Sequence, residues 1–342
     1  MTRDGDVTVG VVGLGYWGPN LARNFAALEG CRLTWCCDSS EESRSRWERS
    51  LPGTRFTGDL ADLLADEELD AVVVATDVPS HAALAIRALS AGKHCFVEKP
   101  LARSTAEAAE VVAAADAAGR TLMVGHLLEY HPGIAKLKEI VASGELGDVF
   151  YVYSNRLNLG KIREDENALW SLGAHDVSVL LHLFDGEEPS EVLTRGESFV
   201  RPGVEDVVFC YLRFPSGRVA HMHLSWLDPH KERRLTVVGS RRMATFDDMA
   251  LERKLTVYDK GFDPDFRNYG EYITRSGDVM SPHIPNEEPL RIECRHFVEC
   301  IRSGTEPQSG SESAMRTVRV LESLQRSLDE GGVPQALAGS GA

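Results

Sequence analysis

The stretch VTVGVVGLGYWG, residues 7–18, decides the fold of this 342-residue chain. Residues 7–12 form a mostly apolar run, which predicts a buried β-strand. Directly after it, Gly13, Gly15 and Gly18 stand in the spacing G-x-G-x-x-G at the start of a predicted helix. The first glycine permits a tight turn, the second lets the backbone approach a pyrophosphate, and the third allows close packing of helix on strand. The stretch therefore predicts a dinucleotide-binding turn, with Tyr16 and Trp17 beside the three glycines.

An acidic residue at the end of the second predicted strand indicates which dinucleotide binds. Asp38 follows the apolar run 33–37 and stands about 20 residues after Gly18. A carboxylate there hydrogen-bonds the ribose hydroxyls and repels a 2′-phosphate, so we expect NAD rather than NADP. The phosphates would lie at the N-terminus of the first helix, where N–H groups and the helix dipole favour anions.

The order of predicted elements indicates two domains. Short apolar strands alternate with helices up to residue 124, which predicts an α/β Rossmann domain, a doubly wound parallel sheet, over residues 1–124. Residues 125–337 contain runs of adjacent strands, which predict an α+β domain with a mostly antiparallel sheet. Residues 260–289 are rich in Gly, Pro and Asp and predict a long loop, and residues 338–342 a mobile tail.

Composition and charge exclude several classes of protein. With 37 Lys and Arg against 52 Asp and Glu, the formal net charge is −15, and such a field repels nucleic acid. It attracts cationic small molecules, although acidity that serves only solubility is the simpler interpretation. No apolar run approaches the roughly 18 residues that span a membrane, and no apolar signal core precedes residue 7. The seven cysteines are odd in number and form no C-x-x-C pair, which favours a reduced, cytoplasmic protein without a zinc site.

Two further segments follow predicted strands, at the edge where open parallel sheets bind ligands. The first contains Thr76, Pro79 and His81, although Pro79 also fits an ordinary start of a helix. The second is Glu98-Lys99-Pro100, where two charges directly follow a buried strand. We expect both segments to contact the cofactor.

These motifs resemble those of a known family. The strand and turn at 9–18, Glu98-Lys99-Pro100 and Gly173-Ala174-His175-Asp176 together resemble the glucose–fructose oxidoreductase/inositol dehydrogenase/MocA (Gfo/Idh/MocA) family over nearly the whole chain. The stretches 16–20, 155–158 and 166–171 resemble the branch of NAD-dependent 3-dehydrogenases that act on nucleotide-linked acetamido sugars and sugar acids. The resemblance implies a Rossmann domain, a second domain with a large open sheet, and homodimers or homotetramers packed through those sheets.

Oxidation of a secondary alcohol needs a base that takes the hydroxyl proton as the hydride leaves. Lys99 is the first candidate, because burial and a positive nicotinamide lower the pKa of a lysine and the resemblance implies a catalytic role. His175 stands at the family's catalytic-histidine position and is the second candidate, with a packed core histidine as the alternative. Ser171 replaces the aspartate that the family often carries, so no Lys–Asp–His triad is expected, and Asp176 would orient a neighbour.

The substrate is expected between the two domains. Candidate binding residues, besides the catalytic pair and Asp176, are Tyr130, Asn155, Arg156, Asn158, Lys161, Arg163 and Asn167. The cations among them would clamp a phosphate or carboxylate, unless the loop is merely solvated. His126 and Trp170 are further candidates for cofactor contact. No metal is expected, because His221 and His223 have no third ligand at a supportive spacing, and an intersubunit sheet face is the favoured interpretation of that strand.

We therefore expect an NAD-dependent oxidoreductase that transfers a hydride to or from a secondary ring hydroxyl of a sugar, at C3. A nucleotide-linked amino or acid sugar, in sugar or antibiotic biosynthesis, is the favoured substrate. An aminoglycoside or a free aminosugar is the alternative, which the charge of −15 suits better. From another class, a non-catalytic NAD-binding redox sensor is possible, but the presence of both Lys99 and His175 argues against it.

Overall fold

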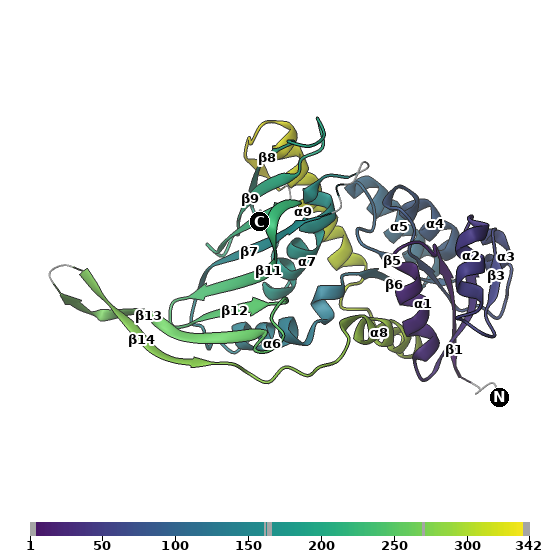
Figure 1. The fold of residues 1–342 in the computed structure, drawn as a ribbon, viewed down its shortest axis with the longest axis horizontal. Coiled ribbons are helices and arrows are strands. Elements are labelled where there is room, and N and C mark those ends of the chain that lie inside the picture. Colours follow the sequence, from purple (N-terminus) through teal and green to yellow (C-terminus); the bar gives the residue numbers. More distant parts are fainter. Residues whose placement is uncertain (1–4, 161, 163–165, 269–270, 338–342) are drawn as a thin grey trace. The chain divides into compact units, whose positions relative to one another are not determined.

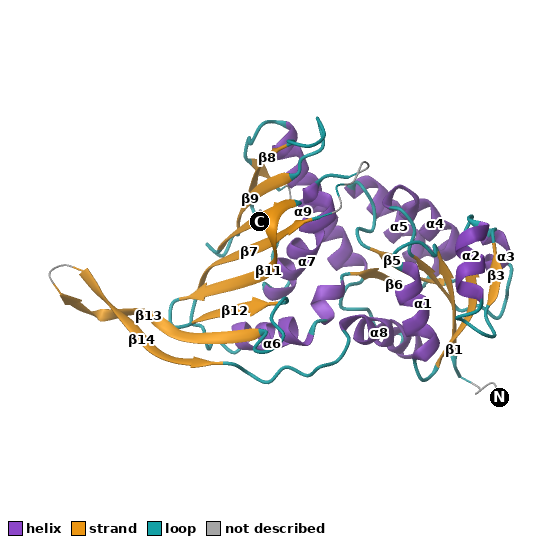
Figure 2. Ribbon diagram, viewed as in Figure 1, coloured by secondary structure: helices purple, strands orange, loops and turns teal. Residues whose placement is uncertain are grey.

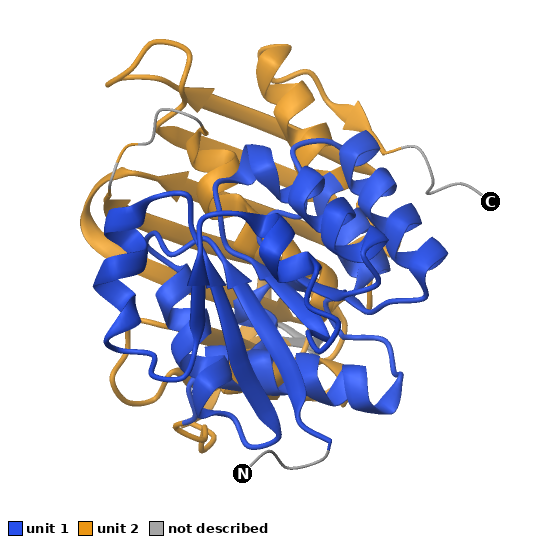
Figure 3. Ribbon diagram, turned by 90° about the vertical axis from the view of Figure 1, so that its right-hand side faces the viewer, with its two compact units in different colours: residues 1–130, 287–318 blue, residues 131–286, 319–342 orange. Residues whose placement is uncertain are grey.

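The computed structural model describes residues 5–160, 162, 166–268 and 271–337. The chain divides into two compact units, residues 1–130 with 287–318 and residues 131–286 with 319–342 (Figure 3). The boundary thus differs from the one expected after residue 124, and residues 287–318 pack with the first unit rather than the second. Phe297 is one reason, since its ring lies edge-on to those of Phe25 and Phe96, with centroid distances of 6.3 and 5.7 Å.

Parallel strands form the sheet of the first unit. Among the described residues there are six of them, in the order β3-β2-β1-β4-β5-β6. Figure 2 colours strands orange and the helices of this unit, such as α1, α4 and α5, purple. The elements are β1 (Val7–Val12), α1 (Gly18–Ala27), β2 (Cys31–Cys37), α2 (Glu41–Glu48), β3 (Arg55–Thr57), α3 (Leu60–Leu64), β4 (Ala71–Val74), α4 (Val78–Ser90), β5 (His94–Glu98), α5 (Thr105–Ala118), β6 (Leu122–Gly125), the 3₁₀ helix η1 (Leu127–Tyr130) and α8 (Pro289–Ser303). The predicted doubly wound sheet is confirmed. Its order reverses between β1 and β4, where such sheets bind dinucleotides.

Apolar side chains cover both faces of this sheet. β1 is buried at every position, as expected for a strand between two layers of helices. One cluster of buried residues includes Leu21 of α1 and Phe297 of α8, and the other includes Leu89 of α4 and Val111 of α5. The helices therefore hold the strands from both sides and leave the strand ends to carry polar side chains.

A mostly antiparallel sheet forms the second unit. Its described residues give nine strands in the order β14-β13-β12-β11-β7-β10-β9-β8-β15, in which β7 and β10 pair in parallel and the other neighbours pair antiparallel. The elements are α6 (Pro132–Ala142), β7 (Val149–Leu159), the π-helix η2 (Leu169–Gly173), α7 (Ala174–Leu183), β8 (Glu191–Glu197), β9 (Val207–Arg213), β10 (Val219–Ser225), β11 (Leu227–Gly239), β12 (Met243–Asp247), β13 (Leu255–Asn268), β14 (Glu271–Met280) and β15 (Gln335–Ala336). The helix α9 (Ser311–Asp329) belongs to the first unit up to Val318 and to the second unit from Arg319. The predicted α+β architecture is confirmed.

The expected long loop at 260–289 is wrong. Most of it belongs to the hairpin of β13 and β14, which extends beyond the rest of its sheet (Figure 1). β14 is exposed at every position. A strand without a buried face needs no alternation of apolar and polar residues, so the pattern that normally indicates a strand is absent.

The two faces of β7 differ, and this difference places several candidate residues. Ser154 and Arg156 are buried and hydrogen-bond Asp176 of α7. Tyr153 and Asn155 point to the other face, because successive side chains of a strand alternate. That face carries stacked rings, with Tyr153 and His221 at a centroid distance of 5.4 Å.

All seven cysteines are buried free thiols. Burial raises the pKa of the Cys95 thiol to about 12. Such thiols stay protonated and unreactive.

Over the described ranges, no helix combines the length and the apolar character that a membrane crossing requires.

Candidate functional site

The glycine turn after β1 presents open backbone. Gly13 has a φ of +96°, a conformation that favours glycine. A Cβ on Gly18 would lie 1.8 Å from the carbonyl oxygen of Gly13, so α1 approaches the turn too closely for a side chain. A Cβ on Gly15 would meet no described atom within 4 Å. Two glycines thus close the turn, and the third leaves space beside it for a ligand.

The N-terminus of α1 and the carboxylate of Asp38 fit a dinucleotide at this turn. In the described part of the chain, no side chain caps α1 and its first turn holds no acidic residue, so its N–H groups can bind an anion. Asp38 accepts hydrogen bonds from the backbone N–H of Leu14 at 2.6 Å and of Ser40 at 2.8 Å, one on each carboxylate oxygen. Each oxygen keeps a second lone pair for a ribose hydroxyl.

The aromatic residues of the turn, Tyr16 and Trp17, differ in environment. Tyr16 is 92% exposed. Trp17 is partly buried and its side chain hydrogen-bonds the Glu98 carboxylate. Trp17 therefore joins the turn after β1 to the end of β5, and Tyr16 is the one of the two that remains at the surface.

His81 lies between two backbone carbonyl groups, and its expected contact with the cofactor stays a prediction. It is buried, its Nδ1 lies 2.8 Å from the carbonyl oxygen of Pro100, and its Nε2 lies 3.0 Å from that of Thr76. Both ring nitrogens are thus engaged by backbone, and the ring links the loop after β4 to the loop after β5. Burial lowers the pKa of His81. Pro79 is exposed in the first turn of α4, and the Thr76 hydroxyl lies 2.6 Å from that of Ser80.

Glu98-Lys99-Pro100 lies at the end of β5, on the edge of the sheet that carries the glycine turn. The Glu98 carboxylate accepts the backbone N–H of Lys99 at 3.1 Å and packs on Gly125, where a Cβ would lie 3.1 Å from it. Burial raises the pKa of Glu98 to about 7, against the smaller opposing effects of the Lys99 charge and of hydrogen bonds from Lys99 and Trp17. The Lys99–Pro100 peptide bond is cis.

A group of buried ionisable residues surrounds Glu98 and Lys99. His126 follows β6, is 1% exposed, and finds no hydrogen-bond partner for either ring nitrogen among the described residues. Burial and, secondly, the Lys99 charge lower the pKa of His126 to about 3, so its ring is neutral. Glu129 of η1 and Glu293 of α8 are buried as well. Burial raises the pKa of Glu293 well above the usual value, and the charges of Glu98 and Glu129 raise it further.

Glu129 and Glu293 are not among the residues that the sequence motifs indicate. A signal for Glu293 was present, because it lies three residues after Leu290 and four before Phe297 on one face of α8. Both of these neighbours are buried. A glutamate on the apolar stripe of an amphipathic helix breaks the apolar pattern, and this break indicates a functional residue.

Tyr130 is buried and hydrogen-bonded within the first unit. It is 6% exposed, and its hydroxyl lies 3.0 Å from that of Ser309. Ser309 also donates to the carbonyl of Val124 at 2.7 Å. Through Ser309, Tyr130 thus joins the end of η1 to β6, and its expected contact with the substrate stays a prediction.

In the second unit, Asp176 and Arg156 form a buried ion pair. The Arg156 Nε donates to Asp176 at 2.5 Å, and the Ser154 hydroxyl donates to the same carboxylate. Arg156 is therefore held by the Asp176 carboxylate, which joins β7 to α7, and its expected contact with the substrate stays a prediction. His175, next to Asp176, is partly exposed at the start of α7. Lys99 and His175 thus belong to different units.

The asparagines that were expected to bind substrate differ in their hydrogen-bond partners. Asn155 points to the open sheet face and donates to Glu232 at 2.9 Å, away from the face that packs on α7. Asn167 is buried and donates to Glu205 at 2.8 Å and to Gln325 at 2.9 Å. Trp170 donates to the same Gln325 at 3.1 Å. These contacts give Asn155 and Asn167 structural partners.

Asn158 remains the asparagine with binding capacity, since its Oδ1 is buried and has no hydrogen bond from the described residues. Lys161 and Arg163 lie outside the described residues. His221 and His223 stack on Tyr153 and Phe209, and in the ranges that the structure describes no group of three or more His, Cys, Asp or Glu side chains could hold a metal ion.

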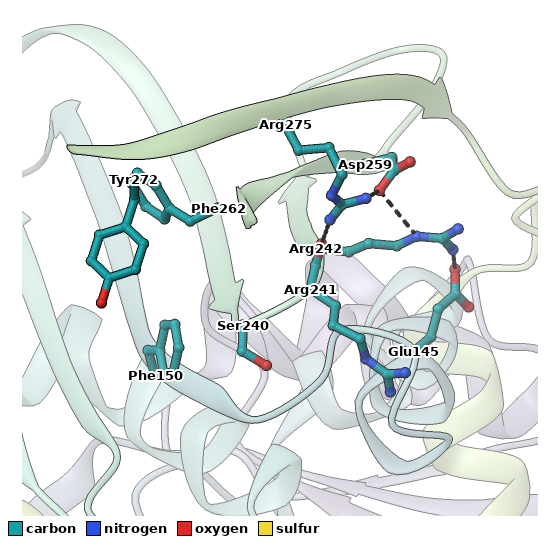
Figure 4. Close-up of a pocket in the computed structure, with 9 residues that line it drawn as sticks. All are labelled: Glu145, Phe150, Ser240, Arg241, Arg242, Asp259, Phe262, Tyr272 and Arg275. Carbon is teal, nitrogen blue, oxygen red and sulfur yellow. Dashed lines mark hydrogen bonds and ion pairs between the residues drawn. The ribbon is translucent and has the colours of Figure 1, made fainter. Parts of the chain in front are cut away.

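A cavity of about 990 Å³ lies elsewhere in the second unit, between the β13–β14 hairpin and the loop before β12 (Figure 4). None of the described candidate residues lines it. Its Arg242 pairs with Glu145 at 2.6 Å, and its Arg275 pairs with Asp259. The charges of these two arginines are thus neutralised by carboxylates that also line the cavity.

Comparison with known proteins identifies the family. Residues 7–126 match the model of an oxidoreductase family with an NAD-binding Rossmann fold, and residues 134–245 match the GFO/IDH/MocA C-terminal domain. The chain belongs to the GFO/IDH/MocA family. It is therefore an NAD-dependent oxidoreductase, of a family that includes sugar dehydrogenases.

Individual members show how far the similarity reaches. The chain is 30% identical to UDP-N-acetylglucosamine 3-dehydrogenase from Acidithiobacillus ferrooxidans over 253 residues, 74% of this chain and 77% of that one. It is 26% identical to scyllo-inositol 2-dehydrogenase (NAD(+)) from Bacillus subtilis over 317 residues, 88% of each. The crystal structure of a putative oxidoreductase from Magnetospirillum magnetotacticum has a TM-score of 0.79 and 32% identity, and covers 93% of this chain and 99% of that one.

Proposed function

We propose that this member of the family transfers a hydride between NAD and the C3 hydroxyl of a nucleotide-linked sugar, with Lys99 exchanging the hydroxyl proton. The position of Lys99 carries the proposal. It follows β5 at the carboxyl edge of the parallel sheet, the edge that also presents Gly15 and Asp38. Ligands of open α/β sheets bind outside this edge.

Bound NAD⁺ accepts the hydride when the alcohol is oxidised. The residues of the chain itself bind the cofactor and orient the substrate. The turn at Gly15 and the N-terminus of α1 hold the pyrophosphate, and Asp38 holds the ribose. Lys99 takes the proton from the hydroxyl oxygen during oxidation and returns it during reduction. We assign His175 to the substrate side of the reaction, as a second group that can exchange a proton.

The choice of a nucleotide-linked sugar is supported by the 30% identity to UDP-N-acetylglucosamine 3-dehydrogenase. We propose that Lys161 and Arg163 contact the diphosphate and that Asn158 contacts the sugar. An aminoglycoside is the second candidate, because the net charge of −15 favours a cationic substrate.

A panel of substrates separates these candidates. UDP-N-acetylglucosamine, scyllo-inositol and gentamicin A are each mixed with the protein and NAD⁺, and NADH formation is followed by absorbance. We expect saturable NADH formation with the UDP-sugar and none with the aminoglycoside. The reverse result would replace the nucleotide sugar by the aminoglycoside, and no NADH with any substrate would favour the non-catalytic redox sensor.

We also propose that two or four copies associate through the open face of the second unit's sheet. Phe209 is 52% exposed there and stacks on His223 at 4.4 Å. Light scattering on the wild type and on Phe209→Glu tests this. We expect the substitution to give monomers, and a monomeric wild type would contradict the proposal.

A further inference from the structure

Three glutamates lie together in the first unit, and Lys99 and NAD do not account for them. Glu129 and Glu293 are buried, and Glu98 is partly buried. Glu98 ends β5, Glu129 belongs to η1 and Glu293 to α8. The Glu98 carboxylate packs on Gly125, which ends β6 shortly before η1, and α8 packs against η1. In agreement with this packing, the charges of Glu98 and Glu129 both act on Glu293. Grouped carboxyl groups repel one another once ionised, so such an arrangement holds protons.

Glu293 is the most unusual member of the group. It is 0% exposed, and neither carboxyl oxygen has a hydrogen bond from the residues that the structure describes. An ionised carboxylate without partners is unstable in such a place, so Glu293 stays protonated and neutral at neutral pH. Because it adds no negative charge, it leaves Glu98 able to ionise.

Glu98 is the member of the group that contacts Lys99, the proposed base. Its carboxylate accepts the backbone N–H of Lys99 at 3.1 Å, and the Lys99 charge acts on it directly. With a pKa of about 7, Glu98 exchanges its proton near neutrality, whereas an ordinary glutamate is fully ionised there. The other groups that face this cluster are Trp17, His126, Tyr130 and Cys294. None of these four is an anion at neutral pH, since the pKa values of Tyr130 and Cys294 are raised by burial.

We propose that Glu98 is the proton acceptor for Lys99, and that Glu293 is a buried neutral acid that keeps Glu98 available for this role. The inference rests on the proposed function. During oxidation the substrate C–H bond breaks as its hydride passes to NAD⁺, the O–H bond breaks, and the proton forms an N–H bond on the Lys99 amine. That N–H bond then breaks as an O–H bond forms on the Glu98 carboxylate. Lys99 is again an amine, ready for the next hydroxyl.

Glu98 acts through Lys99 and is therefore a positioning residue, and infrared spectroscopy can observe its protonation. The holoenzyme with NAD⁺ is mixed at pH 7.5 with UDP-N-acetylglucosamine, which has no carboxyl group of its own, and the infrared difference spectrum is recorded as NADH forms. We expect a gain in the band of a protonated carboxyl group and a matching loss of carboxylate. Glu98→Gln should lose both signals and lower kcat by about tenfold or more.

Glu299→Gln is the matched control, since it removes an exposed carboxylate from the same helix as Glu293. It should keep the signals and the kcat. NADH formation without a protonated-carboxyl signal in the wild type would overturn the role of Glu98 and leave the proposed function intact. The same signal in Glu98→Gln would overturn it too, because another carboxyl group would then be the acceptor. No NADH from the UDP-sugar, scyllo-inositol or gentamicin A would overturn the proposed function and this inference together.

Discussion

Asp176 in the second unit and Glu293 in the first are both buried carboxyl groups, but their surroundings differ. Asp176 accepts hydrogen bonds from Ser154 and Arg156, so its charge is fully compensated. Glu293 receives no hydrogen bond from the described residues and lies near two other glutamates. Leaving such a group unsatisfied costs on the order of 1–3 kcal/mol. The first arrangement stabilises the fold, whereas the second costs stability and is best explained by chemistry beside Lys99.

The largest effect is expected at Lys99, the residue that follows Glu98, whose charge acts on Glu293. Lys99→Ala should lower kcat by roughly 10²–10⁴-fold, because it removes the group that takes the hydroxyl proton. The dissociation constant for NAD should change little, since the turn at Gly15 and Asp38 hold the cofactor. Steady-state kinetics and a binding titration measure the two quantities, with Lys136→Ala, an exposed lysine of α6, as the control. Equal losses of kcat and NAD affinity would make Lys99 a cofactor-binding residue instead.

The second-largest effect is expected on stability, when the ion pair of Arg156 and Asp176 is broken. Arg156→Met should lower the free energy of unfolding by about 3–5 kcal/mol, because it leaves the buried Asp176 carboxylate without its cation. Urea titration measures the loss. Adding Asp176→Leu to the same chain should restore most of it, since no unpaired charge then remains. A loss below about 1 kcal/mol in the single variant would mean that the pair is not buried as the structure shows.

A pH-dependent effect of opposite sign is expected at Glu98. Its pKa of about 7 in the folded protein exceeds the usual value of 4.5, so the folded state binds more protons than the unfolded state between these values. The stability that this provides is fully present below pH 4.5 and is lost as the pH rises through 7. Glu98→Gln should therefore raise the melting temperature relative to wild type by about 2 °C or more at pH 8, and by less at pH 5.

Glu293→Gln should act in the same direction, since burial raises the pKa of Glu293 as well. Thermal unfolding at several pH values measures both variants. A melting-temperature difference from wild type that does not change between pH 5 and pH 8 would contradict the assignment of these carboxyl groups as proton-holding.

The smallest effect is expected at Asp38, a carboxylate that is compensated by backbone N–H groups and still faces the ribose. Asp38→Ala should reduce the preference for NAD over NADP by about tenfold, because the group that accepts from the ribose and repels a 2′-phosphate is lost. The ratio of kcat/KM for the two cofactors measures it. An unchanged ratio would place the ribose elsewhere.

The sequence predicts the fold well where patterns are local. The buried strand at 7–12, the glycine turn and Asp38 follow each other at spacings that sterics and hydrogen bonding require. The hairpin of β13 and β14 could not be predicted, because exposed strands carry no apolar alternation. The packing of α8 with the first unit depends on Phe297, Phe25 and Phe96, which are far apart in sequence and meet only in the fold.

The candidate site was predictable as a set of strand ends but not side chain by side chain. Lys99 and Asp38 are placed by the strands that they follow. His81, Tyr130, Arg156 and Asn167 were expected to contact ligands, and each is buried and has partners inside its own unit. The sequence does not distinguish a polar residue that binds a ligand from one that stabilises a loop. The two differ in their hydrogen-bond partners, which come from distant segments of the chain.

A structure of the protein with NADH and UDP-N-acetylglucosamine, a pair that cannot react, tests the central claim most directly. We predict that the Lys99 Nζ lies roughly 2.6–3.2 Å from the C3 hydroxyl oxygen of the sugar, which is the reach of a group that exchanges its proton. A complex in which Lys99 points away from the sugar and another side chain binds that hydroxyl would contradict the account.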